Sequence, residues 1–467
     1  MTFTTGSMQE FGSASERGGN GPDAGLVLLF AEPFAALPAA WPLLGRGRTV
    51  IGREAPAEIV LPVSAVSRVH AEIVTEGRET VIRDLGSRNG LIVNGRRVAS
   101  VSLEPFDEVR VGDALLKYVA SDVLDYARYR LDGSMLAGTA RRTKSLGALV
   151  GGFQMDRIGA ELERIAPTLL NVMVLGPSGT GKEVVARELH RLSGRSGAFL
   201  AVNCAAIPAH LLESELFGFK RGAFSGADRD KPGIVRMAHR GTLLLDEIGD
   251  MPLEAQAKLL RVIQSKEVLP LGATQPELVD VRIACATHRD LARLQREGRF
   301  REDLFARLDE YEVRLPPLHE RKEDIFSLTT SFIAQQGRAG TLPSVSCLFA
   351  LLHHDWPYNV RELEAAVKRA LALSAGPRLE VEHLPDAVRE AISDYGQSEG
   401  AAPSGAAEGE GEGEPQSSRS PEEPALRALL DRHRGNVAAV GRELGKARMQ
   451  IHRWMKRYGI EVDDYRR

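Results

Sequence analysis

Two short segments carry the residue types needed to bind and hydrolyse a nucleoside triphosphate. The first lies between an apolar run and a helix-like run, and it is rich in glycine. Glycines let consecutive backbone N–H groups turn toward phosphate oxygens, and a following lysine places a positive charge beside the outer phosphates. This pattern predicts a phosphate loop formed by Gly176, Pro177, Ser178, Gly179, Thr180, Gly181, Lys182 and Glu183.

The second segment is an acidic pair, Asp246 and Glu247, directly after the apolar run Leu243–Leu245. A phosphate loop usually has Ser or Thr after its lysine to bind Mg²⁺, but Glu183 takes that position here. We therefore expect Asp246 to bind Mg²⁺ and Glu247 to act as the base for the attacking water. The expected ligand is ATP with Mg²⁺. Because the two motifs follow strand ends in the expected order, two unrelated surface turns are a poor alternative.

Alternating strands and helices must position these segments. From 148 to 320, apolar strand-like runs alternate with helical patterns, which is typical of a parallel sheet with crossover helices. Residues 321–394 have helical patterns. The sequence therefore predicts an α/β ATPase core over 148–320 and a helical lid over 321–394.

The flanking regions differ in composition. Residues 25–122 read as short strands broken by turn signals, which predicts a β-sandwich between a flexible tail (1–24) and a linker (123–147). Residues 395–424 are rich in Gly, Ser, Pro and Glu, which predicts a disordered acidic linker. Residues 425–467 hold eleven Lys or Arg against five Asp or Glu in helix-like patterns.

Bulk properties exclude several classes of protein. A chain of 467 residues is long enough for two to four domains. It has neither an apolar run of about 20 residues nor a secretory signal, so we expect a cytoplasmic protein without a membrane partner. The net charge is only −3, so nucleic-acid binding requires a local basic region. Three scattered cysteines are expected to be free, packed thiols.

Residues from about 148 to 390 resemble the AAA+ domain of sigma-54-dependent activators, also called bacterial enhancer-binding proteins. The most diagnostic part is Glu213–Gly218 followed by a loop that the family writes GAFTGA, with Ser225 in place of threonine. The resemblance implies an ATPase whose loop contacts sigma-54 RNA polymerase holoenzyme. The contact residues would be Gly222, Ala223, Phe224, Ser225, Gly226 and Ala227.

The same resemblance assigns further roles in ATP hydrolysis. They are Asn203 as the switch that holds Glu247, Thr287 as the first sensor, Arg361 as the second sensor, and Arg301 and Arg307 as arginine fingers. Fingers donated by neighbouring subunits imply a homo-oligomer, from a dimer to a hexameric ring. Two positions depart from the family: His288 stands where asparagine is usual, and Tyr358 replaces a glycine.

Four motifs between residues 51 and 95 resemble a forkhead-associated (FHA) domain: Ile51–Glu54, Ser67–His70, Asp84–Gly90 and Asn94–Gly95. The resemblance implies a partner that carries phosphothreonine, or a Ser/Thr kinase. A guanidinium and a hydroxyl suit a doubly charged phosphate. The implied contacts are Arg53, Ser67, Arg68 and Asn89, with His70 as structural support. The alternative is a sandwich that has lost its ligand.

Residues 435–460 resemble the Fis-type helix-turn-helix that ends this family. The second helix would enter the major groove of upstream, enhancer-like DNA as part of a dimer. Base contacts are expected from Arg448 and Gln450, and phosphate contacts from Arg453, Lys456 and Arg457. A merely solvated basic helix is the alternative.

Together these patterns predict a multidomain chain: an FHA β-sandwich, an α/β AAA+ P-loop NTPase with a helical lid, and an all-α DNA-binding domain. The predicted function is ATP-driven opening of sigma-54 promoters under phosphothreonine control. Two alternatives remain. Ser225 and Tyr358 leave room for a DNA-bound regulator without productive polymerase contact. A phosphopeptide adaptor with vestigial hydrolysis is opposed by the presence of both nucleotide motifs.

Overall fold

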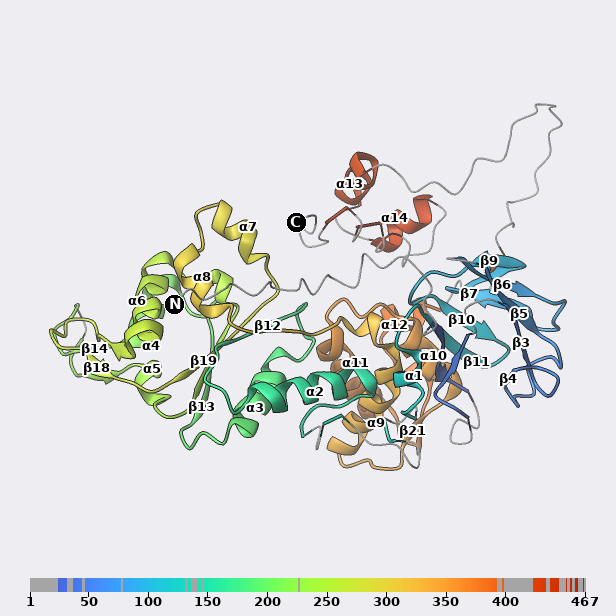
Figure 1. Cartoon of the computed structure of the whole chain (residues 1–467), viewed down its shortest axis with the longest axis horizontal. Coiled ribbons are helices and arrows are strands. Elements are labelled where there is room, and N and C mark those ends of the chain that lie inside the picture. The colour runs from blue at the N-terminus through green and yellow to red at the C-terminus, as the bar shows by residue number, and fades with distance from the viewer. Residues whose placement is uncertain are drawn as a thin grey trace, which may run out of the picture. The chain divides into compact units, whose positions relative to one another are not determined.

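The computed structural model describes residues 24–31, 37–43, 47–76, 79–130, 133–135, 142–143, 147–225, 227–392, 397–398, 423–433, 437–444, 451, 454–455, 458–460 and 465. The chain divides into two compact units, residues 1–127 with 390–467, and residues 128–389 (Figure 1). No helix in the described ranges is long and apolar enough to cross a membrane.

The first unit contains a sandwich of two β-sheets, with strand orders β2-β1-β11-β10-β7-β8-β23 and β4-β3-β5-β6-β9. Neighbouring strands are antiparallel except β3 with β4 and β8 with β23. The strands are β1 (Gly25–Phe30), β2 (Ala40–Pro42), β3 (Gly47–Gly52), β4 (Ile59–Val60), β5 (Ala71–Glu76), β6 (Glu79–Asp84), β7 (Leu91–Val93), β8 (Arg96–Val98), β9 (Ser100–Ser102), β10 (Glu108–Val111), β11 (Ala114–Val119) and β23 (Gln397–Ser398).

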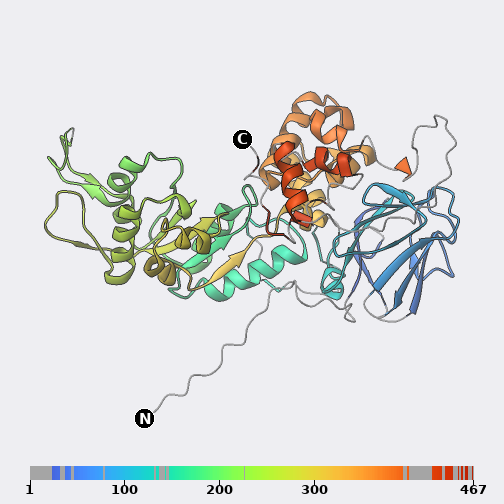
Figure 2. The same ribbon diagram turned by 90° about the horizontal axis from the view of Figure 1, so that it is seen from above.

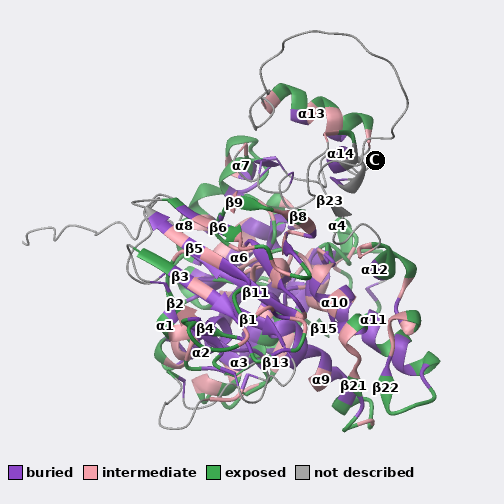
Figure 3. Ribbon diagram, turned by 90° about the vertical axis from the view of Figure 1, so that its right-hand side faces the viewer, coloured by how far each residue is buried: buried purple, intermediate pink, exposed green. Residues whose placement is uncertain are grey.

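Alternating burial along the strands explains the sandwich. In β6, Thr80 and Ile82 are buried, whereas Glu79 and Arg83 are exposed, so one face packs on the core. Figure 3 shows the buried stretches of the strands in purple. The Tyr118 hydroxyl donates to Thr80 Oγ1 (3.2 Å) and joins the two sheets. The predicted β-sandwich fold is confirmed.

The second unit is built on a five-stranded parallel sheet with the order β13-β16-β19-β12-β20. Figure 2 shows the green to yellow strands of this unit among its helices. Its central strands are almost continuously buried and apolar, as expected for a sheet covered on both faces. The strands are β12 (Val172–Leu175), β13 (Phe199–Asn203), β16 (Thr242–Asp246), β19 (Arg282–Thr287) and β20 (Glu312–Arg314).

Helices and short hairpins connect these strands, and they confirm the predicted α/β core. The helices are α2 (Phe153–Ile165), α3 (Lys182–Ser193), α4 (Ala209–Phe217), α5 (Ile234–Met237), α6 (Leu253–Ser265), α7 (Leu291–Arg296) and α8 (Glu302–Leu308). The hairpin strands are β14 (Gly218–Phe219) with β15 (Lys231–Pro232), and β17 (Glu267–Val268) with β18 (Glu277–Leu278).

The predicted helical lid is also confirmed. It contains α9 (Ile325–Gln335), α10 (Val345–His353), α11 (Asn359–Leu373) and α12 (Asp386–Glu390), with the short parallel pair β21 (Leu342–Pro343) and β22 (Arg378–Leu379). The α9 helix packs against both α10 and α11.

The segment predicted as a linker, 123–147, contains packed residues. Helix α1 (Val123–Tyr126) packs on β1 and β2 of the sandwich. In the second unit, the buried carboxylate of Asp156 on α2 accepts hydrogen bonds from the Tyr129 hydroxyl and from the backbone N–H groups of Arg142 (2.8 Å) and Thr143 (3.0 Å). This part of the segment is therefore anchored on the ATPase core.

Near the C-terminus, α13 (Glu423–Arg432) and α14 (Val437–Leu444) share a small apolar core with Ile451 and Trp454. The predicted DNA contacts Arg448, Gln450, Arg453, Lys456 and Arg457 lie outside the described residues, as does Gly226 of the predicted sigma-54 loop.

Candidate functional site

The segment predicted as a phosphate loop joins the end of β12 to the start of α3. Gly176, Gly179 and Gly181 have φ values of 156°, 78° and 106°, in the region that favours glycine. A Cβ on Gly179 would lie 2.1 Å from the Tyr358 carbonyl oxygen, so the lid approaches the loop too closely for a side chain. These glycines and the α3 N-terminus fit a bound phosphate chain.

Lys182 supplies the positive charge of this loop. Its Nζ donates to the carbonyl oxygens of Gly176 (2.8 Å) and Pro177 (3.3 Å). Burial lowers the pKa of Lys182, while the nearby charges of Glu247 and Asp246 oppose that shift. Glu183 is turned away into an ion pair with Arg187 (2.6 Å).

The acidic pair lies at the end of β16, two strands from β12 and its phosphate loop: Asp246 is the last residue of the strand and Glu247 follows it. Burial and the neighbouring Glu247 charge raise the pKa of Asp246, against the effect of Lys182. Half-buried carboxylate oxygens beside a phosphate loop fit the hard-cation chemistry of Mg²⁺. Glu247 has a left-handed backbone (φ 50°), and its N–H donates to Asp246 Oδ1 (3.1 Å).

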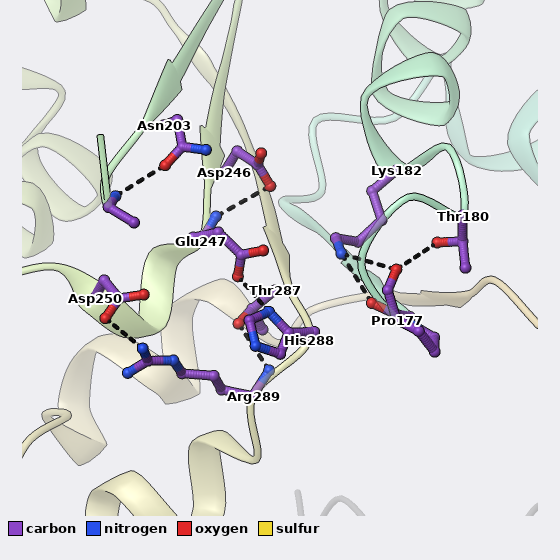
Figure 4. A network of polar contacts seen from close by, with 12 residues as sticks. Pro177, Thr180, Lys182, Asn203, Asp246, Glu247, Asp250, Thr287, His288 and Arg289 are labelled. Carbon is purple, nitrogen blue, oxygen red and sulfur yellow. Dashed lines mark hydrogen bonds and ion pairs between the residues drawn. The ribbon is translucent and has the colours of Figure 1, made fainter. Parts of the chain in front are cut away.

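The end of β19 lies between the two motifs and contacts both of them (Figure 4). Thr287 is fully buried, and its carbonyl accepts a long hydrogen bond from Gly176 N–H (3.4 Å). His288 Nδ1 lies 2.9 Å from Glu247 Oε2. Burial alone would raise the pKa of Glu247, but the hydrogen bonds and charge of His288 together with the charge of Lys182 outweigh it and lower that pKa.

Asn203, the predicted switch residue, ends β13 beside Asp246. Its Oδ1 accepts from the backbone N–H groups of Ala205 (2.9 Å) and Ala206 (3.2 Å), while Glu247 bonds to His288 instead. Figure 4 shows Asn203 with its side-chain oxygen on this turn.

The two predicted arginine fingers lie on or beside α8, and both are exposed. The Arg301 guanidinium forms two hydrogen bonds with the Asp303 carboxylate (3.0 and 2.7 Å). The Arg307 carbonyl accepts from Asn171 Nδ2 (2.9 Å). Their partners belong to α8 and to the segment before β12, so neither finger is bonded to its own phosphate loop.

The lid contributes residues to the site that the sequence motifs did not predict. Asn359, at the start of α11, donates from Nδ2 to the Ser178 carbonyl (2.9 Å) and accepts from Leu318 N–H (2.8 Å). Arg321 is buried and donates from Nη2 to the Thr180 carbonyl (2.9 Å). The predicted second sensor, Arg361, donates its N–H to Gly179 (3.3 Å). The one sequence feature that could have indicated a role for Asn359 is its position two residues before Arg361.

The predicted sigma-54 loop lies between β14 and β15. The Phe224 side chain is 43% exposed and stacks edge-on against Phe219, with ring centroids 4.9 Å apart. Gly222 N–H bonds to the Ala227 carbonyl (2.9 Å), and the Asp230 carboxylate binds Lys220 Nζ (3.0 Å) and Arg221 N–H (2.8 Å) below the tip. An exposed aromatic tip is thus held on an ordered base.

The residues of the sandwich predicted to contact a phosphopeptide lie on neighbouring loops. Ser67 Oγ accepts from Arg88 N–H (3.1 Å), and Arg53 N–H bonds to the Ser67 carbonyl (2.9 Å). Asn89 Nδ2 donates to the Ala65 carbonyl (2.7 Å), while the exposed Arg68 pairs with Glu54 (3.2 Å).

Comparison with known proteins assigns these regions to families. Family models match a sigma-54 interaction domain at residues 151–314, an FHA domain at 49–112 and an AAA+ ATPase lid domain at 319–401. The chain belongs to the sigma-54-dependent transcriptional activators that carry an FHA domain. Its central part is an AAA+ ATPase that consists of a sigma-54 interaction domain followed by an AAA+ lid domain.

Individual relatives cover different shares of the chain. The regulator HoxA of Cupriavidus necator is 35% identical over 401 residues, which cover 79% of this chain and 80% of that protein. Regulatory protein AtoC of Escherichia coli is 39% identical over 315 residues, 66% of this chain and 67% of that protein. The chain spans only 36% of Escherichia coli UacR.

Among solved structures, NtrX from Brucella abortus in complex with ATP has a TM-score of 0.48 at 34% identity, over 69% of this chain and 71% of that chain. The FHA domain of CT664 from Chlamydia trachomatis has a TM-score of 0.19 at 32% identity, over 21% of this chain and 95% of that chain.

Proposed function

We propose that this activator, bound to upstream DNA through residues 425–467, uses ATP hydrolysis to convert the closed complex of sigma-54 RNA polymerase into an open complex. A phosphothreonine-bearing partner or kinase bound at the FHA domain controls this activity. The observation that supports it most is an exposed Phe224 on the same domain as a complete phosphate loop and acidic pair.

The chemistry follows from the residues around the phosphate loop. Lys182 would leave the loop carbonyls and bind the outer phosphates, while Glu247 would accept a proton from the attacking water. Asp246 would hold Mg²⁺, which supplies neutralisation of phosphate charge when bound. The exposed Arg301 and Arg307 are suited to reach the nucleotide of a neighbouring subunit in a ring of up to six.

Open-complex formation on a sigma-54 promoter tests this proposal. Substituting Phe224→Ala should leave basal ATP hydrolysis within about twofold of wild type, because the loop lies outside the phosphate site. Promoter opening should fall at least tenfold, which corresponds to a loss of about 1.4 kcal/mol in the coupling of ATP hydrolysis to promoter opening. Met237→Ala provides a matched control, since Met237 is also an exposed apolar side chain of this domain.

Hydrolysis without any opening by the wild-type chain, even with phosphothreonine peptides added, would contradict the proposal. That result would favour the second candidate, a DNA-bound regulator without productive polymerase contact. Equal opening by wild type and Phe224→Ala would instead show that polymerase contact is made elsewhere.

A further inference from the structure

Three arginines on or beside the predicted phosphopeptide loops have no acidic partner. Arg88 and Arg97 are exposed and Arg53 is half-buried. Within the described ranges, none of their guanidinium groups forms a hydrogen bond or an ion pair. Arg68, by contrast, pairs with Glu54 (3.2 Å). Planar guanidinium groups without a carboxylate partner are suited to bind anionic groups of a ligand.

The acidic side chains of the same region are directed to backbone N–H groups. The Asp84 carboxylate accepts from the N–H groups of Gly86 and Ser87 (both 3.2 Å) and from the Ser87 hydroxyl (2.5 Å). The Glu58 carboxylate accepts from Val50 N–H (2.8 Å). These carboxylates stabilise the turns of the sandwich, and they form no ion pair with the three arginines in the described parts of the chain.

Arg97 is placed against the backbone of the loop that holds Asn89. A Cβ on Gly90 would lie 2.2 Å from Arg97 Nε and 2.5 Å from its Nη2, so the guanidinium lies directly on the Gly90 main chain. Gly90 has a φ of 74°, a conformation that favours glycine. Because Asn89 is the predicted contact for the peptide backbone, a bound peptide would pass close to the Arg97 guanidinium.

Arg53 and Arg97 approach the predicted contacts from different sheets of the sandwich. Arg53 follows β3, and its N–H bonds to the Ser67 carbonyl. Arg97 lies on β8, in the other sheet, and its guanidinium lies at Gly90. The fully buried His70 joins these two positions through Ser67 N–H and the Gly90 carbonyl. Arg53 is therefore suited to the phosphothreonine, which leaves Arg97 for another anionic group.

We propose that Arg97 binds a second anionic side chain of the peptide, beside the phosphothreonine, and so selects partners with acidic or doubly phosphorylated sequences. The proposal rests on the proposed binding of phosphothreonine by the FHA domain. A carboxylate and a second phosphate share the acceptor oxygens that a guanidinium binds, and the phosphate carries the larger charge. Arg97 lies outside the four motifs that predicted this domain, which end at Gly95.

Fluorescence anisotropy on the full chain tests this selection with three labelled peptide mixtures that all contain phosphothreonine. The first mixture excludes acidic residues beside the phosphothreonine, the second has aspartate or glutamate there, and the third has a second phosphothreonine. The second mixture should bind about three- to fivefold more tightly than the first, because an exposed ion pair is weak. The third should bind at least about tenfold more tightly, because guanidinium–phosphate bonds are stronger.

Three variants assign the selection to one side chain. With Arg97→Ala the three mixtures should bind with equal affinity. Arg97→Glu should prefer a mixture with lysine beside the phosphothreonine, since the charge of the subsite is reversed. Arg83→Ala is the matched control, because Arg83 is an exposed arginine of β6 that lies 3.9 Å from Glu72, and both preferences should remain.

The outcomes separate this proposal from the proposed role of the FHA domain. If the wild-type chain prefers no phosphorylated mixture over its threonine counterpart, phosphothreonine binding itself fails. If it does prefer them but binds all three equally, phosphothreonine binding stands and the Arg97 subsite is wrong. Equal weakening of all three mixtures by Arg97→Ala would also overturn the subsite, because Arg97 would then only support the loop at Gly90. Loss of the preferences in Arg83→Ala would assign them to overall positive charge.

Discussion

A buried histidine organises the loops that hold the predicted phosphopeptide contacts. His70 is fully buried, its Nδ1 accepts from Ser67 N–H (3.1 Å), and its Nε2 lies 3.2 Å from the Gly90 carbonyl. Because Nδ1 accepts a hydrogen bond, it carries no hydrogen, and in the neutral ring the hydrogen must be on Nε2. Burial lowers the pKa of His70 below its usual value, which keeps the ring neutral and both loops tied together.

Arg53 lies beside the loops that His70 ties together, and we predict that its guanidinium binds the phosphate of a phosphothreonine peptide. Arg53→Ala should weaken binding of a degenerate phosphothreonine peptide mixture by about tenfold or more, since charge-assisted bonds contribute about 1.5–3 kcal/mol. Binding is measured by fluorescence anisotropy on the full chain, with the matching threonine mixture as the blank.

Arg83→Ala is the matched control for this variant. Arg83 is another exposed arginine of the sandwich, but it lies on β6 near Glu72 (3.9 Å). Equal loss in both variants would indicate attraction by overall positive charge. Failure of the wild-type chain to prefer the phosphorylated mixture would favour a sandwich that has lost its ligand.

At the scale of elements, the lid is joined to the phosphate loop at the start of α11. Asn359 is 2% exposed, has a φ of 53°, and satisfies one carbonyl and one N–H on two other segments. An unpaired buried backbone group costs about 1–3 kcal/mol, so this amide is a main tie between lid and core.

Asn359→Gly should therefore weaken ATP binding by about tenfold, or ~1.4 kcal/mol, and lower the melting temperature. Glycine keeps the left-handed backbone, so the loss reports the side-chain bonds alone. Binding is measured by calorimetry and unfolding by differential scanning calorimetry. Glu364→Ala, which removes an exposed pair with Lys368 on the same helix, should change neither. Unchanged ATP affinity in Asn359→Gly would mean that other contacts hold the lid.

The sequence predicted elements and motifs better than contacts between them. The phosphate loop and acidic pair could be predicted because each is a continuous pattern at a strand end. Asn359 and Ser178 are 181 positions apart, and no local pattern links them. Likewise, the family pattern pointed to Asn203 as the partner of Glu247, but whether its amide faces Glu247 or its own turn depends on the packing of β13, β16 and β19.

At the scale of the whole molecule, the chain contains a phosphate loop and two predicted arginine fingers, Arg301 and Arg307, that do not contact this loop in the described residues. Arg301 is occupied by Asp303 on its own helix, and Arg307 is exposed. A guanidinium that stabilises the transferring phosphoryl group must lie against the nucleotide. Hydrolysis in trans would meet this requirement. In a closed symmetric ring every subunit makes the same head-to-tail contact with the next, so the finger of each subunit can reach the phosphate loop of its neighbour.

Mixing two inactive variants tests that arrangement. Lys182→Ala removes the positive charge of the phosphate loop, and Arg301→Ala removes a predicted arginine finger. Each protein alone should therefore hydrolyse ATP at least tenfold more slowly than wild type. In a random equal mixture, about a quarter of the interfaces join an intact loop to an intact finger, so about a quarter of wild-type activity should return. Steady-state ATP hydrolysis against mixing ratio should peak near equal amounts. Activity that never exceeds the weighted mean of the two variants would place the finger in the same subunit as its loop.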